Sequence, residues 1–193
     1  SGKVLFMRVF IAIIVLIFSF QSWTKADDIK DFEIEGMSIG DSALDFFSLS
    51  HIKSNSWDDY SGGKYIRVQN DELSFFKTYD AVDFHYKADD KNYIIQNISG
   101  VIFYDNNIKD CYSKMDSIIV EISKNLNYIS KSSKQTSEFS EDKKSKWTDV
   151  SFKLKSGYIY VTCYDYSKES GGQDNLKVSL DNEEINQWFV SLN

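Results

Sequence analysis

The chain has 193 residues, 42% of them hydrophobic, and this length suits one domain with a single core. Residues 1–26 hold three of the 22 basic side chains and none of the 29 acidic ones, so residues 27–193 carry a net charge of −10, with Arg67 as their only arginine. Because phosphate and base recognition relies on arginine and positive charge, this composition excludes nucleic acid as an expected partner.

The N-terminal segment has the layout of a secretory signal peptide. Val9–Phe20 is an almost unbroken apolar run, and the basic Arg8 stands directly before it. Thr24 and Ala26 supply the small residues that precede a cleavage site. The sequence therefore predicts that residues 1–26 form a signal peptide.

Cleavage there would release residues 27–193 as a single exported domain, periplasmic or secreted. The alternative is that the segment stays attached and anchors the protein in the inner membrane through residues 9–23. In that case the uncleaved N-terminus would be the only membrane contact.

The first half of the domain is predicted as a short helix followed by three strands. Asp41 stands where an N-cap is expected, before a helical segment that runs to Ile52. Alternating apolar residues then predict strands at 65–68, 75–87 and 93–104, which would pair as an antiparallel meander.

The second half repeats this order with a longer helix. Apolar residues from Ile108 to Ile129 follow the spacing i, i+3, i+4, i+7 of an amphipathic helix. The polar segment 130–146 is predicted as a mobile surface loop. A short helix from Glu183 is expected to close the chain. A second meander is predicted from three alternating segments: 150–154, 158–166 and 176–180.

These elements predict an α+β fold. An antiparallel sheet made of two meanders would be packed on one face by the long amphipathic helix, which gives a two-layer sandwich.

The two cysteines are expected to form a disulfide. Cys111 lies on the apolar face of the long helix, and Cys163 lies on the strand face that Ile159 and Val161 share. An exported protein meets an oxidising compartment, so a bridge is favoured over two buried free thiols.

Four tyrosines lie on the other face of the same strand: Tyr158, Tyr160, Tyr164 and Tyr166. If helices cover the opposite face, this row forms an amphipathic surface on the open side of the sheet, suited to a protein, a peptide or a sugar. The alternative is that the rings only stabilise a half-exposed sheet through cross-strand pairs.

Gly40-Asp41-Ser42 resembles the nucleophile block of the SGNH-type hydrolases, in which the serine attacks an ester. That chemistry needs a histidine base, which those families carry in a D-x-x-H block. Neither His51 nor His85 stands in such a block. Ser42 is therefore interpreted as an early helix residue behind an Asp41 cap.

Asp83 and His85 would project from one strand face, but two candidate ligands do not make a metal site. No metal and no cofactor are expected.

Three segments resemble a group of small exported bacterial proteins of unknown function: IEGMSIGDSALDFFS (34–48), ISGVIFYDNNIKDCYSKMDSI (98–118) and SGYIYVTCYDYS (156–167). The G-M-S opening into a helix and a meander is also similar to the SmpA/BamE-type lipoproteins of outer-membrane assembly. The chain departs from that family because it lacks a lipobox cysteine and continues into a second helix–meander half.

The sequence thus predicts a non-enzymatic exported protein that binds an envelope protein or a small ligand through the open face of its sheet. Two alternatives stay open. One is a serine hydrolase using Ser42, and the other is a structural envelope protein anchored in the membrane.

Overall fold

The structure is a computed structural model that describes residues 28–58, 63–71, 73–105 and 107–192. The predicted signal peptide lies outside the described residues. The expected α+β class is confirmed, since a large antiparallel sheet is combined with a few helices.

All strand pairs of the sheet are antiparallel. β4 and β9 pair over seven residues at its centre and so join the early strands to the late ones. The strands follow one another across the sheet in this order: β1 (Ser56–Trp57), β2 (Tyr65–Asp71), β3 (Ala81–Lys87), β4 (Asn97–Phe103), β9 (Asn175–Asn182), β8 (Gly157–Asp165), β7 (Lys146–Lys153) and β5 (Ser130–Lys131), with β6 (Gln135–Glu138) also paired to β7.

The helices of the described residues are short apart from one. None of them is long and apolar enough to cross a membrane. Their bounds are η1 (Ile29–Asp31), η2 (Ala43–Asp45), α2 (Leu49–Ser54), α3 (Ile108–Asn125) and α4 (Glu183–Ser191).

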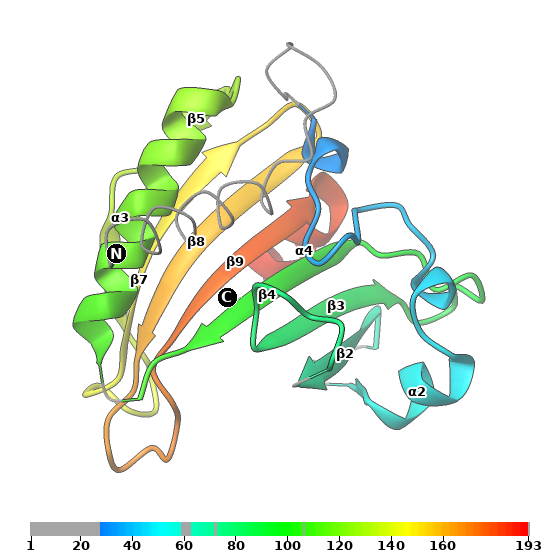
Figure 1. The fold of residues 1–193 in the computed structure, drawn as a ribbon, viewed down its shortest axis with the longest axis horizontal. Coiled ribbons are helices and arrows are strands. Elements are labelled where there is room, and N and C mark those ends of the chain that lie inside the picture. Colours follow the sequence, from blue (N-terminus) through cyan, green and yellow to red (C-terminus); the bar gives the residue numbers. More distant parts are fainter. Residues whose placement is uncertain (1–27, 59–62, 72, 106, 193) are drawn as a thin grey trace, which may run out of the picture.

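The hydrophobic core lies on the sheet face that α3 covers. The apolar stripe of α3 is buried against β8 and β9, and Figure 1 shows the helix running along these strands. Cys111 of α3 and Cys163 of β8 form a disulfide, with Cα atoms 6.1 Å apart. The predicted bridge is therefore confirmed.

The opposite face of the sheet is polar, and the last helix packs on it. In α4, Asn186 accepts a hydrogen bond from the Tyr160 hydroxyl, and the ring of Phe189 lies 5.3 Å from that of His85. The sequence predicted helices on one face only. The difference arises because Asn182 ends β9 and caps α4 at once, which turns the chain onto the polar side.

Two expectations for the first half are wrong. Asp41 does not cap a helix, since its carboxylate accepts a hydrogen bond from the Ser38 amide, and Ser42 caps η2 instead. The strand expected from residue 75 begins only at Ala81, because the Glu35 carboxylate binds the amides of residues 77–79 and holds them in a turn.

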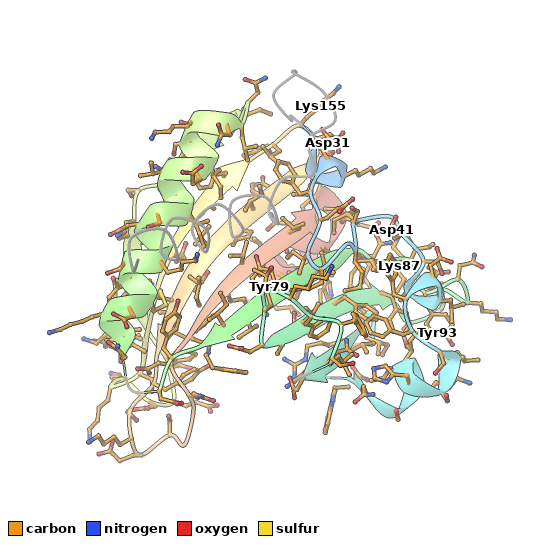
Figure 2. All side chains as sticks on the ribbon, viewed as in Figure 1. Asp31, Asp41, Tyr79, Lys87, Tyr93 and Lys155 are labelled. Carbon is orange, nitrogen blue, oxygen red and sulfur yellow. A yellow bond between two sulfur atoms is a disulfide. The ribbon has the colours of Figure 1, made fainter. Side chains whose placement is uncertain are left out.

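That turn places the ring of Tyr79 over β4, as Figure 2 shows. The ring covers Gly100 so closely that a Cβ atom there would lie 2.5 Å from it. A glycine is required at this position because a side chain would push Tyr79 off the sheet.

The segment 130–146 is not a loop throughout, because it contains the edge strands β5 and β6. Both pair with β7, and the hydroxyls of Thr136 and Thr148 lie 2.8 Å apart across the β6–β7 pair. An edge strand is held by backbone hydrogen bonds and needs no apolar face, so the hydrophobic pattern cannot reveal it. The mobility of the segment stays a prediction.

Candidate functional site

The polar face of the sheet holds an open hollow of about 380 Å³. Six strands, β2–β4 and β7–β9, contribute lining side chains, and α4 closes one end. This volume lies near the lower end of the range for small-molecule sites.

Two small residues leave room for the hollow at the centre of the sheet. Ser99 of β4 and Ser179 of β9 stand opposite each other, with hydroxyl oxygens 2.8 Å apart. Their neighbours in the same cross-strand row are the larger Asp83 on one side and Tyr160 on the other. The short serines therefore form a depression between taller side chains.

A largely buried ion pair crosses this depression. Lys177 of β9 reaches over β4 and donates a 3.0 Å hydrogen bond to Oδ2 of Asp83 on β3. Asp83 is only 7% exposed. Its Oδ1 atom is buried and has no hydrogen-bond partner among the described residues.

The pair stays charged in spite of its burial. Burial acts to raise the pKa of Asp83, but attraction to Lys177, His85 and Arg67 outweighs it and the pKa is lowered. Burial likewise acts to lower the pKa of Lys177, but attraction to Asp83 outweighs it and the pKa is raised. At neutral pH a fixed ammonium therefore lines the hollow, with a fixed carboxylate buried directly beside it.

A second polar chain runs from β3 across β4 to β9. Nδ1 of His85 lies 2.8 Å from Oδ1 of Asn97, and Nδ2 of Asn97 donates a 2.5 Å hydrogen bond to Asp181. Because the Asn97 oxygen can only accept, Nδ1 of His85 carries the hydrogen.

Burial shifts the pKa values of the two end residues of this hydrogen-bonded row, His85 and Asp181, in opposite directions. Burial lowers the pKa of His85 to about 4, so the imidazole is neutral at physiological pH. Burial raises the pKa of Asp181 to about 6, although the Asn97 hydrogen bond partly opposes the shift. Nearer the solvent, burial also raises the pKa of Asp149 on β7.

The tyrosine row divides between the hollow and its surroundings. Tyr160 and Tyr164 line the hollow, whereas Tyr158 and Tyr166 stack on them from outside, each with ring centroids 6.1 Å apart. All four rings are half-buried. Burial raises the pKa of Tyr160 to about 12, so its hydroxyl stays protonated. Trp147 of β7 extends this aromatic wall.

The buried charged residues of the hollow were missed by sequence reasoning. Asp83 and His85 were considered only as candidate metal ligands, and Lys177 and Asp181 were not singled out. The available signal was the polar alternation Lys177-x-Ser179-x-Asp181, which marks one strand face as polar. Alternation cannot show that β3 and β9 face the same hollow across β4, because that depends on register.

The serine of the hydrolase-like block has a structural role. The Ser42 hydroxyl donates to the Asn92 carbonyl oxygen at 2.7 Å and accepts from the Leu44 amide. The two histidines are bonded elsewhere: Nε2 of His51 lies 2.6 Å from Asn70, and His85 contacts Asn97. This geometry gives no support to a catalytic role for Ser42.

Across the described ranges, no three His, Cys, Asp or Glu side chains are grouped as a metal site requires. Asp83 and His85 do share a strand face, but each contacts a different partner, Lys177 for the carboxylate and Asn97 for the imidazole.

No family model, curated protein or solved structure matches this chain.

Proposed function

We propose that this protein is a non-enzymatic, exported binding protein that holds a small polar ligand in the hollow on its open sheet face. The observation that carries the proposal is the buried Asp83–Lys177 pair, whose carboxylate keeps one oxygen without a described partner. A buried charge pair is weak as a source of stability and an unsatisfied buried oxygen is unfavourable. Because Lys177 of this pair lines a concave site, the pair points to a ligand.

The shape of the molecule supports this assignment. We interpret the fold as two meanders that meet at β4 and β9 and form a two-layer sandwich with α3 on one face. The other face is left open except at its end, where α4 stands. Clefts of this kind, with aromatic walls and a few polar groups, are typical of small-molecule sites.

Export is supported by the disulfide, since such bonds persist in oxidising compartments. We expect protein recovered from an exporting bacterium to have the mass of a chain that starts at Asp27. Recovery of the uncleaved chain in the membrane fraction would favour the alternative, an anchor formed by residues 9–23.

The binding function is tested by screening a library of small sugars, amines, carboxylates and amino acids with ¹H–¹⁵N correlation spectra. Compounds that bind should shift the amide signals of residues around the hollow. The double variant Tyr160→Ser/Tyr164→Ser should no longer show these ligand-induced shifts, while its dispersed spectrum shows that it is still folded. The double variant Tyr158→Ser/Tyr166→Ser, which changes the same row outside the hollow, is the matched control. Hits that persist in the first variant would show that the ligand binds elsewhere.

A further inference from the structure

The hollow has unused hydrogen-bonding capacity of both kinds. Lys177 has three N–H donors and gives one to Asp83. Asp149, which also lines the hollow, has a carboxylate that accepts nothing from the described residues. A ligand that fits must therefore both donate and accept hydrogen bonds.

The charges of the hollow alternate in sign rather than separating into a positive and a negative end. Lys177 and Asp149 belong to one cross-strand row with only Thr162 of β8 between them, which puts their Cα atoms roughly 10 Å apart. Asp83 lies at 3.0 Å on the other side of Lys177. An ionic ligand of either sign would therefore lie within about one Debye length of a like charge.

A zwitterionic ligand meets the same difficulty. Its carboxylate would need Lys177 or Arg67, and both of these cations lie in the field of the Asp83 carboxylate. Asp83 would repel the incoming carboxylate at short range. A hydroxyl avoids this conflict because it is uncharged and can both donate and accept.

The walls of the hollow favour a ring with one apolar face. Trp147, Tyr160 and Tyr164 supply aromatic surface on the β7–β8 side, and Phe189 of α4 lies at the other end. Sugar rings carry hydroxyls at their edges and C–H groups on their faces, so they match a site with polar groups on its floor and aromatic rings on its walls.

From these observations, and resting on the binding function proposed above, we infer that the hollow takes an uncharged polyhydroxylated ligand, a saccharide of one or two rings. Asp149 would accept hydrogen bonds from its hydroxyls near the entrance. Lys177 would contact it at the floor, and Asp83, which lies beside the hollow, would hold the Lys177 ammonium in place.

The inference is tested by titration calorimetry with two panels of probes of similar size. The first contains neutral methyl glycosides, maltose, cellobiose and N-acetylglucosamine, and the second contains spermidine, glutarate and glycylglycine. We expect saturable binding from the neutral panel. Its affinity should change little between low and high salt, whereas screening would weaken an ionic ligand.

Variants with one atom changed give the matched control. Asp149→Asn should weaken the bound saccharide about tenfold or more, because a hydrogen bond to a charged group is lost. Asp165→Asn, the same change on β8 outside the lining of the hollow, should leave the affinity unchanged.

The outcomes separate the two proposals. If no saccharide binds, or if Asp149→Asn has no effect on a saccharide that does, the ligand class is wrong. The proposed binding function would still hold if charged probes or library compounds bind at the hollow. If no compound binds there, the proposed binding function is wrong too.

Discussion

The sheet carries two cross-strand rows that lie one residue apart along the same five strands but on opposite faces. The row toward α3 is Val82, Gly100, Val178, Val161 and Val150, and the row on the open face is Asp83, Ser99, Ser179, Tyr160 and Ser151. The first row is apolar throughout and buried, with Tyr79 covering Gly100 and α3 packing on β8 and β9. The second is polar although two of its members, Asp83 and Ser99, are also buried.

The comparison shows that burial has two different causes in this molecule. On the α3 face, apolar groups leave water, which is favourable in proportion to their area. On the open face, polar groups are buried by their own neighbours and by α4, and they need partners to offset the loss of water. We expect stability to depend mainly on the first face and ligand binding on the second.

The largest expected effect concerns the disulfide of the apolar face. The bridge joins residues 52 positions apart. In the chain-entropy description, its removal in Cys111→Ala/Cys163→Ala costs about 4 kcal/mol of unfolding free energy. Urea denaturation with and without reductant measures this loss. The chain has no other cysteine, so the reductant should destabilise the natural protein and leave the variant unchanged.

The next effect concerns the ion pair of the open face. Lys177→Met leaves Asp83 as a buried charge without its partner and should cost about 3 kcal/mol in urea denaturation. The double variant Asp83→Asn/Lys177→Met should recover much of that loss, because no unpaired charge remains. Lys168→Met, at an exposed position, is the control. Equal stability of the two lysine variants would show that the pair does not need both members.

The pH dependence of stability separates two buried groups of the open face. The pKa of Asp181, about 6, lies above its ordinary value of 3.8, so its contribution to stability is complete below pH 3.8 and is lost as the pH rises through 6. The pKa of His85, about 4, lies below its ordinary value of 6.5. Its contribution is complete above pH 6.5 and is lost as the pH falls through 4.

These contributions oppose each other between pH 4 and 6. Relative to the natural protein, Asp181→Asn should become more stable as the pH rises, and His85→Gln should become less stable. Each difference should reach roughly 3 kcal/mol across the window. Denaturation curves at several pH values test this, and parallel pH profiles for all three proteins would contradict it.

The smallest effect concerns the helix that closes the hollow. The Asn182 side chain accepts a 2.9 Å hydrogen bond from the Ile185 amide and so caps α4. Asn182→Ala should cost about 1 kcal/mol, measured by urea denaturation. Asn182→Ser keeps a capping oxygen and should lose less. If both variants lose the same amount, the cap is not what holds the helix.

The two faces also differ in how far the sequence predicts them. The apolar face was predicted well: the spacing of Cys111, Met115 and Ile118 identified the buried side of α3, and alternation along β8 placed Cys163 opposite it. Such patterns are local and follow directly from the periods of helices and strands.

The hollow depends on contacts that no local pattern contains. Asp83 and Lys177 are 94 positions apart and meet only because β4 pairs with both β3 and β9. Glu35 likewise binds the amides of residues 77–79, which lie more than 40 positions away, and no local sequence pattern indicates this contact. Sequence reasoning therefore found the aromatic wall at Tyr160 and Tyr164 but not the charged floor.

The central pairing of β4 with β9 also determines when the sheet can finish folding during synthesis. A growing chain contains β4 (Asn97–Phe103) long before β9 (Asn175–Asn182), so one edge of β4 stays unpaired while the residues between these strands are made. Contacts so distant in sequence close slowly, and a free edge can pair with other chains in the meantime. The sheet therefore stays unfinished until β9 has been made, and during that interval the exposed edge of β4 needs protection from pairing with other chains.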